Sequence, residues 1–184
     1  MTGLVVNSAT SQLVIIDMQV KLASAMPLDA MQSVIKNCRI LVQASNLLAV
    51  PTTATEQYPQ GLGETLPEIK QFLSNNKPIT KTAFSACDAP NFNQQLHRDK
   101  PQIMLAGMEA HICVLQTASA LLQTGKQVFI VEDAIISRNS ANKANALARM
   151  RDAGCVITNT ESVVFEWLGD ANHEAFKAIS KLIR

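Results

Sequence analysis

Leu13-Val14-Ile15-Ile16-Asp17 is the most informative stretch of the chain, because four apolar residues are followed at once by a carboxylate. An apolar run without polar alternation predicts a strand that is buried on both faces, as in a parallel sheet covered by helices. In such a sheet, ligands bind beyond the carboxyl ends of the strands. Asp17 is therefore the first candidate site residue.

Strand and helix patterns alternate along the rest of the chain. Strands are predicted at 13–16, 50–55, 79–82, 102–106, 127–132 and 155–158. Helices are predicted at 29–49, 66–73, 92–97, 141–153, 161–168 and 172–182. Another predicted helix carries Leu115, Ala118 and Leu122 on one face and ends at Gly125. We expect the fourth strand to stop at Gly107, the 66–73 helix to end at 74–76, and the turn-rich segment 57–63 to be a loop. The alternation favours a parallel sheet with helices on both faces.

Composition limits the classes of protein to which the chain can belong. The 184 residues are 47% hydrophobic and 17% charged, which predicts one globular domain over 1–184. Lys+Arg 16 against Asp+Glu 15 gives a net charge of +1, so we expect no binding of nucleic acid or of an anionic membrane. No apolar run is long enough to span a bilayer, and the N-terminus lacks the pattern of a secretory signal.

The cysteines and histidines are too scattered to predict a metal cluster. Cys38, Cys87, Cys113 and Cys155 form no CxxC pair, and the chain has three isolated histidines. Free thiols are typical of a reducing compartment, so we expect a cytoplasmic protein.

Two more reactive side chains follow predicted strands. Lys81 is the last polar group of the third strand. Cys113 follows the turn 107–111, and we expect it in the first turn of the next helix, where the helix dipole and free N–H groups favour a thiolate and can stabilise an oxyanion. With Asp17, these residues form a possible nucleophilic set in which a thiolate attacks, a carboxylate carries the proton and an ammonium orients it.

Spacing alone leaves plainer interpretations of these three residues open. Asp17 could cap the following turn, Lys81 could be a solvated edge lysine, and Cys113 could be a buried structural cysteine.

Three motifs at the predicted strand ends carry a family resemblance. They are Val14-Ile15-Ile16-Asp17-Met18-Gln19, Thr80-Lys81-Thr82-Ala83-Phe84-Ser85 and Gly107-Met108-Glu109-Ala110-His111-Ile112-Cys113-Val114. In this order, they resemble the isochorismatase-like hydrolase family of cysteine hydrolases. The stretches 55–63, 148–151 and the tail from Trp167 are similar, more narrowly, to isochorismatase domain-containing proteins.

The resemblance implies a three-layer Rossmann-like α/β fold with a six-stranded parallel sheet flanked by helices. It implies a catalytic triad of Asp17, Lys81 and Cys113. It also implies a cis peptide bond between Met108 and Glu109, with the backbone N–H groups of Glu109 and Cys113 forming an oxyanion hole. A homo-oligomer, a dimer or higher, is a further expectation from the family.

The chain departs from the family pattern at informative positions. Nicotinamidase members carry an Asp-x-His metal motif where this chain has Thr55-Glu56-Gln57, so we expect no metal and no cofactor. True isochorismatases lack the cysteine nucleophile, so Cys113 favours cleavage of a C–N bond over a vinyl ether. His111 stands two residues before the nucleophile, where many relatives carry Asp.

Further candidates line the expected substrate pocket. They are Gln19, Tyr58, Phe84 and His111. Gln19 could hold the lysine or a substrate, Tyr58 and Phe84 could form walls with their rings, and His111 is either a helix cap or a proton donor. After the fifth strand, we expect Asp133 and Arg138 to tie down a loop.

The sequence therefore predicts a metal-independent cysteine hydrolase that acts on an amide or carbamoyl bond of a small molecule through a Cys113 thioester. Two alternatives remain. One is a non-catalytic binding or scaffold member of the fold, and the other is a hydrolase of an ester or of a vinyl ether such as isochorismate.

Overall fold

The computed structural model describes residues 3–73 and 77–184. The strands are β1 Ser11–Ile16, β2 Thr52–Gln57, β3 Ile79–Lys81, β4 Gln102–Met108, β5 Gln127–Ile136 and β6 Val156–Thr158. The helices are α1 Val20–Ala23, α2 Leu28–Leu47, α3 Pro59–Leu62, α4 Pro67–Lys70, α5 Phe92–Gln95, α6 Leu115–Gln123, α7 Ser140–Asp152, α8 Thr160–Leu168 and α9 Phe176–Ile183. One 3₁₀ turn, Ala86–Asp88, follows β3, and one π-helical turn, Ala110–Val114, precedes α6.

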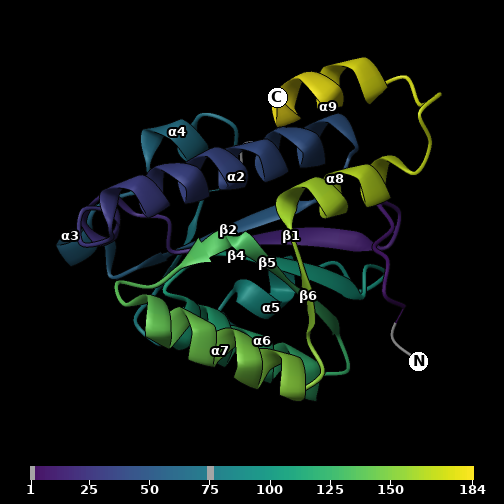
Figure 1. Cartoon of the computed structure of the whole chain (residues 1–184). Helices are drawn as coiled ribbons and strands as arrows, with labels where there is room; N and C mark the ends of the chain where they lie inside the picture. Colours follow the sequence, from purple (N-terminus) through teal and green to yellow (C-terminus); the bar gives the residue numbers. More distant parts are fainter. Residues whose placement is uncertain (1–2, 74–76) are drawn as a thin grey trace.

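Within the described ranges, the strands form one six-stranded sheet in the order β3-β2-β1-β4-β5-β6. Every pair of neighbouring strands is parallel. Helices α2, α8 and α9 lie on one side of the sheet, and α5, α6 and α7 lie on the other (Figure 1). The predicted three-layer α/β fold with a six-stranded parallel sheet is confirmed.

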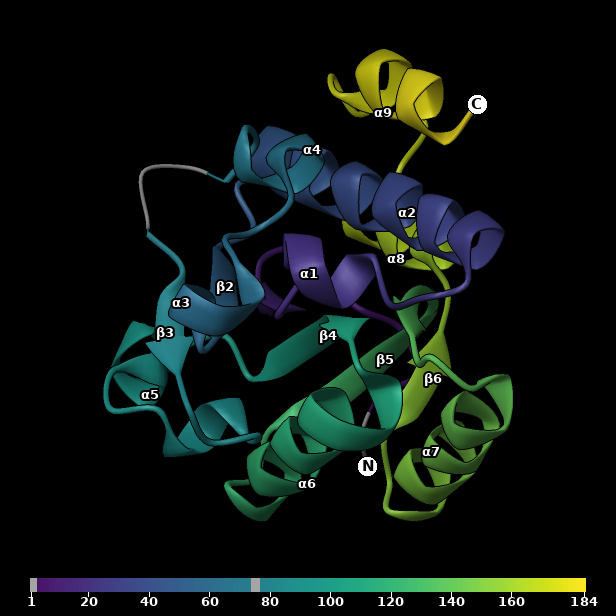
Figure 2. The same cartoon turned by 90° about the vertical axis from the view of Figure 1, so that its left-hand side faces the viewer.

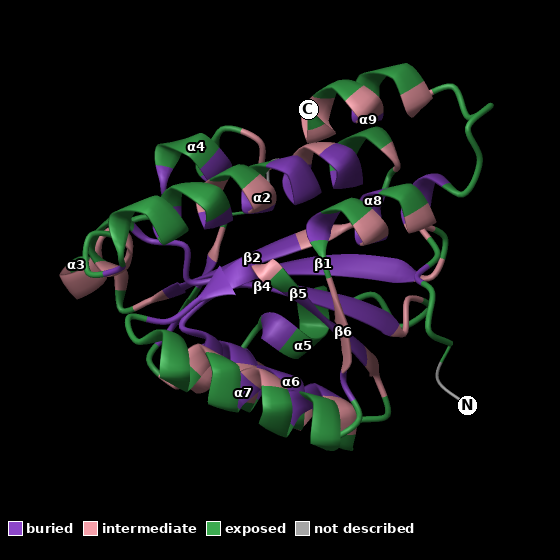
Figure 3. Cartoon of the chain, viewed as in Figure 1, coloured by how far each residue is buried: buried purple, intermediate pink, exposed green. Residues whose placement is uncertain are grey.

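The first strand shows why the apolar run has no polar alternation. Leu13 and Ile15 belong to the core beneath α2 and α8, whereas Val14 and Ile16 belong to the core beneath α6 and α7. All four side chains are at most 1% exposed. In Figure 3 the central strands are mostly buried and β6 is of intermediate burial, whereas many exposed residues lie on the outer faces of the helices and in loops. Successive side chains of one strand thus fill both cores.

The carboxyl ends of β1 and β2 lead into α1 and α3, which lie on the side of the molecule that faces the viewer in Figure 2. Helix α3 falls within the segment predicted as a loop, and α1 was not predicted. Both are single turns of four residues. Such short pieces carry too little periodic pattern to be recognised from sequence.

The predicted ends of three strands were wrong, and the first of these is β2, which continues past Thr55 to Gln57. Strand β4 continues through Gly107 to Met108, and β5 continues past the polar pair Glu132 and Asp133 to Ile136. The β4–β5 register shifts between Leu105 and Gly107, so that β5 bulges where its polar residues lie. Polar residues in a bulge were mistaken for the end of a strand.

The predicted 66–73 helix is also shorter than expected. Only Pro67–Lys70 is helical, and 71–73 continue as a turn. The predicted end of that helix at 74–76 lies outside the described residues. Nowhere in the described chain does a helix have the length and apolar character needed to cross a bilayer.

Gly107 occupies a position in β4 where no side chain would fit. A Cβ at this position would lie 2.0 Å from the Ile16 carbonyl oxygen and 2.7 Å from the Ile16 nitrogen. The φ angle of +117° is also one that residues with a side chain rarely adopt. The closeness of β1 and β4 therefore requires glycine.

We expect Gly107→Ala to destabilise the protein by at least about 3 kcal/mol, because the added methyl group collides with the backbone of β1. Gly125→Ala is the matched control, since it also has a positive φ but no heavy atom within 4 Å of the added Cβ. Left-handed strain alone costs about 1–2 kcal/mol. Urea unfolding measures both values, and equal losses for the two variants would contradict the close approach.

Candidate active site

The structure brings together the charged pair that the sequence singles out. Asp17 directly follows β1, and Lys81 is the last residue of β3. Lys81 Nζ lies 2.7 Å from Asp17 Oδ2, and both side chains are 0% exposed. The interpretations of Lys81 as a solvated edge lysine and of Asp17 as a turn cap are therefore wrong. The two residues form a buried ion pair across β2.

Every proton of the Lys81 ammonium is engaged by an oxygen. Lys81 Nζ donates to Asp17 Oδ2 and to Gln57 Oε1, both at 2.7 Å. It also approaches the carbonyl oxygens of Ala83 at 3.2 Å and Phe84 at 3.1 Å. An ammonium has only three protons, so these oxygens account for its donor capacity.

The second oxygen of Asp17 is held by β2. Thr55 Oγ1 donates to Asp17 Oδ1 at 2.7 Å, and the Asp17 N–H donates to the Thr55 carbonyl at 3.2 Å. Sequence reasoning treated Thr55 and Gln57 only as a missing metal motif and did not see that they hold the ion pair. The available signal was their spacing of two, which places both side chains on one face of a strand.

Cys113 lies in the π-helical turn Ala110–Val114 and not, as expected, in the first turn of α6. Its residue is only 6% exposed. Burial, and then the negative charge of Asp17, raises the pKa of the Cys113 thiol to about 12, against the opposing effect of Lys81. This environment favours a protonated thiol at rest, whereas the position at the start of a helix predicted from the sequence favours a thiolate.

The turn before Cys113 has the expected cis peptide bond between Met108 and Glu109. The Glu109 N–H finds no backbone or side-chain acceptor in the part of the chain that the structure describes. The Glu109 carboxylate accepts a hydrogen bond from the Arg138 N–H at 2.9 Å and pairs with the Arg138 guanidinium at 3.1 Å. This pairing fastens the turn to the segment after β5.

Arg138 thus ties down its loop as predicted, whereas Asp133 has a different role. Asp133 Oδ1 accepts hydrogen bonds from the Thr160 N–H and hydroxyl, both at 2.8 Å. Asp133, which lies in β5, therefore holds the start of α8 instead of a loop next to β5.

Gln19 does not hold the lysine. Its amide bonds the backbone of Gln57 on both sides, through Oε1 to the N–H at 2.7 Å and through Nε2 to the carbonyl at 2.9 Å. Nε2 also donates to the Gly63 carbonyl at 2.7 Å. Gln19 is fully buried, and its side chain fixes the end of β2.

Tyr58 and Phe84 follow β2 and β3 and are each 54% exposed. The Tyr58 ring packs against Gly61, and the Phe84 carbonyl faces Lys81. Both rings remain available at the end of the sheet where the ion pair lies.

His111 does not act as a helix cap, so that interpretation is wrong. Its Nδ1 lies 2.9 Å from Ser137 Oγ, and its Nε2 lies 3.4 Å from Asn142 Nδ2. It links the turn that carries Cys113 to the segment between β5 and α7.

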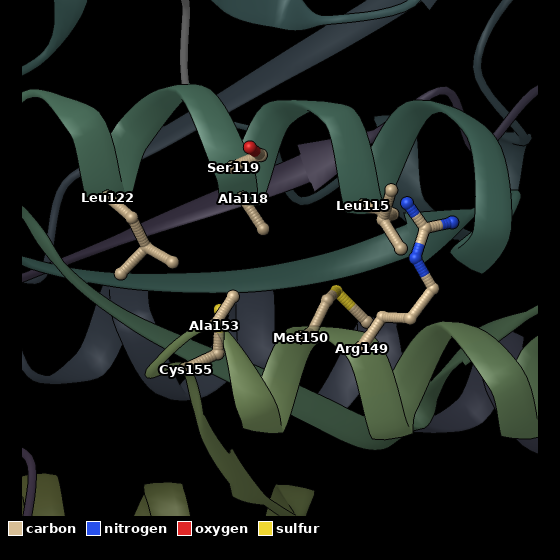
Figure 4. A pocket seen from close by; sticks show the side chains of 8 residues that line it. All are labelled: Leu115, Ala118, Ser119, Leu122, Arg149, Met150, Ala153 and Cys155. Atoms are coloured by element: carbon tan, nitrogen blue, oxygen red, sulfur yellow. The ribbon is translucent and has the colours of Figure 1, made fainter.

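The cavity in Figure 4 lies between α6 and α7 and has a volume of about 100 Å³. It is lined by Leu115, Ala118, Ser119, Leu122, Arg149, Met150, Ala153 and Cys155. No member of the expected triad is among these residues, so the cavity belongs to helix packing. In residues 3–73 and 77–184, no group of three His, Cys, Asp or Glu side chains is arranged to hold a metal ion.

Comparison with known proteins gives a consistent result. The isochorismatase domain model matches residues 11–162. Isochorismatase domain-containing protein 2 of Bos taurus is 38% identical over 178 residues, which cover 95% of this chain and 83% of the relative. A structure described as the MAR1 ribonuclease of Caenorhabditis elegans is 38% identical, with a TM-score of 0.89, over 97% of this chain and 91% of the other. YcaC of Pseudomonas aeruginosa, solved with hexane-2,5-diol and covalent acrylamide, is 26% identical, with a TM-score of 0.88, over 97% and 91% of the two chains.

We expect alkylation of Cys113 by iodoacetamide to keep accelerating with pH above about 9, because only the thiolate reacts and the pKa of this thiol is raised. Asp17→Asn removes a negative charge that raises this pKa. The variant should therefore react faster near neutral pH, by about tenfold for each unit by which the pKa falls.

Peptide mapping resolves Cys113 from Cys87, which serves as the reference within each sample. Burial raises the pKa of Cys87 to about 11, and Asp17 is not among the causes. An unchanged or slower reaction of Cys113 in the folded Asp17→Asn variant would contradict this electrostatic account.

Proposed function

The chain belongs to the isochorismatase family, and we propose that it is a hydrolase that cleaves the C–N bond of a small amide or carbamoyl compound. The observation that carries the proposal is the buried Asp17–Lys81 ion pair facing the Cys113 thiol. A nucleophile, a proton carrier and a fixed charge are the groups that covalent hydrolysis of an amide requires.

In the proposed first step, the Cys113 sulfur attacks the carbonyl carbon while the thiol proton passes to Asp17. The carbonyl π electrons move to oxygen, and the N–H groups of Glu109 and Cys113 stabilise the oxyanion. The unpartnered Glu109 N–H supports this role. As the carbonyl re-forms, Asp17 returns the proton to the leaving nitrogen, and ammonia or an amine departs from a thioester.

In the second step, water attacks the thioester carbon and gives a proton to Asp17. The C–S bond then breaks, the carboxylic or carbamic acid leaves, and Asp17 returns the proton to sulfur. The raised pKa of the Cys113 thiol supports proton transfer during attack over a preformed thiolate. Lys81 supplies a fixed positive charge, because its protons are already engaged by oxygens.

One observation favours an amide substrate, and a second favours a reactive thiol over a purely binding role. Cys113 is placed beside a carboxylate that can both remove and return a proton, which a poor leaving group such as an amine requires. The YcaC relative is described with covalent acrylamide, which is an electrophile toward thiols. A purely binding or scaffold role gives no reason to bury an ion pair against a thiol.

Thr55 and Gln57 support the proposal that no metal takes part. Both stand at the positions of the metal motif of other members, and here their side chains hold Asp17 and Lys81. An uncharged hydroxyl and an amide are also weaker ligands for a divalent cation than Asp and His.

We propose further that residues 1–184 form one hydrolase domain in the cytoplasm, acting as a homo-oligomer on a small molecule. Packing of α9 against α2 and α8 supports a single domain. The exposed apolar side chains of Val20, Tyr58 and Phe84, each following one of the first three strands, support association at that end of the sheet. Light scattering that finds only a monomer would exclude the oligomer.

A panel of primary amides, carbamoyl compounds and esters tests the proposed function through release of ammonia, amine or acid. We expect turnover of at least one amide or carbamoyl compound and a loss of at least about a thousandfold in Cys113→Ala. Cys87→Ala is the matched control and should keep full activity.

Other outcomes favour other functions. Ester cleavage that survives in Cys113→Ala would favour a hydrolase that does not use the thiol. Binding without turnover would favour a non-catalytic member. A short RNA belongs in the panel because the C. elegans relative is described as a ribonuclease, and its cleavage would overturn the small-molecule proposal.

A further inference from the structure

We propose that the groove between α2 and α9 is a second binding site, and that it takes a small phosphate ester with an apolar or aromatic body. None of Asp17, Lys81 and Cys113 lines this groove. The inference is therefore independent of the proposed hydrolase.

Two helices and one turn form the groove. Helix α2 supplies half of its lining, the end of α9 supplies most of the rest, and the turn after α4 supplies Phe72. Figures 1 and 2 both show α4 and α9 on the outer side of α2, and both helices pack against it. The lining residues are Lys36, Arg39, Ile40, Gln43, Phe72, Lys181, Leu182 and Arg184.

The size of the groove suits a small molecule. Its volume is about 480 Å³, and sites for small organic ligands have volumes of about 300–1,000 Å³. The cavity between α6 and α7 has only about 100 Å³.

All charged side chains of the lining are positive. Lys36 and Arg39 are three residues apart on α2, and Lys181 and Arg184 are three residues apart at the end of α9. Four positive charges, less the carboxyl group of Arg184, leave the lining with a net charge of at least +3. Over the whole chain, Lys+Arg 16 nearly balance Asp+Glu 15. The groove is thus a local excess of one sign.

The protein does not neutralise these cations with ion pairs. Over 3–73 and 77–184, the ion pairs are Lys70–Glu64, Lys81–Asp17 and Arg138–Glu109. None of them includes a cation of the groove. The rest of the sequence, 1–2 and 74–76, has no carboxylate side chain. Because α2 and α9 bring like charges together, a bound anion would relieve their repulsion.

The apolar part of the lining favours an organic anion over a bare one. Ile40 is 4% exposed, and Phe72 and Leu182 are half-buried against the same core cluster. An apolar or aromatic body can lie against these three side chains. The guanidinium groups of Arg39 and Arg184 can each donate two parallel hydrogen bonds to phosphate oxygens. The lining therefore fits both ends of a phosphate ester.

Isothermal titration calorimetry with naphthyl phosphate tests the proposal, with inorganic phosphate and naphthol as the two halves of the probe. We expect naphthyl phosphate to bind with a Kd below about 1 mM. Each half should bind at least about tenfold more weakly, because it loses either the cations or the apolar surface. Added salt should weaken the binding of naphthyl phosphate.

Charge reversal on each side of the groove locates the site. We expect Arg39→Glu and Lys181→Glu each to raise the Kd of naphthyl phosphate at least about tenfold, because an attraction becomes a repulsion. Arg151→Glu is the matched control, since this exposed arginine lies on α7, on the other side of the sheet. It should change the Kd by less than about twofold.

Arg39 and Lys181 are exposed and lie on different helices, so one variant keeps the proposal testable if the other does not fold. Absence of binding, or binding that survives both reversals, would overturn the proposal. Equal affinity for inorganic phosphate would overturn the assignment of an organic ligand. Binding only of a short RNA, or only of vesicles that contain phosphatidic acid, would overturn the assignment of a small molecule.

Discussion

The buried ion pair between Asp17 and Lys81 is the constraint from which the arrangement of the site follows. Removing two charges from water costs on the order of several kcal/mol per ion, and their attraction offsets this only when the remaining hydrogen-bonding groups are satisfied. Thr55 satisfies the carboxylate, and Gln57 and two carbonyls satisfy the ammonium. The ends of three neighbouring strands must therefore lie side by side, so that the side chains of β2 reach both Asp17 and Lys81. The parallel pairing of β1, β2 and β3 provides this alignment.

This pair also determines what the cysteine can do. A thiol beside a nearly neutral pair gains little net stabilisation of its anion, so burial raises its pKa. In the proposed reaction the proton leaves during attack on the substrate, and the adjacent carboxylate is the group that takes it. Glu109 completes the arrangement, because its ion pair with Arg138 holds the turn that carries both an unpartnered N–H and the proposed nucleophile, Cys113.

Much of the fold could be predicted from local pattern. The run Leu13–Ile16 fills both cores, so its lack of polar alternation correctly indicated a central parallel strand. The meeting of Asp17 with Lys81 followed from strand ends and family resemblance. Gln57 could not be found in the same way, because its contact with Lys81 depends on the β2–β3 register. The continuation of β4 through Gly107 depends on the close approach of Ile16, and the raised pKa of the Cys113 thiol depends on burial. Local sequence reveals neither of these.

The proposed mechanism requires the Cys113 thiol to carry its proton in the resting protein. Infrared difference spectroscopy between the unmodified protein and Cys113→Ala would isolate the S–H stretching band of this one side chain. The account requires a band that is present at neutral pH and persists above about pH 9, since the thiol pKa is raised. A band that is already absent at neutral pH would show a resting thiolate paired with Lys81 and would contradict the assignment of Asp17 as the base.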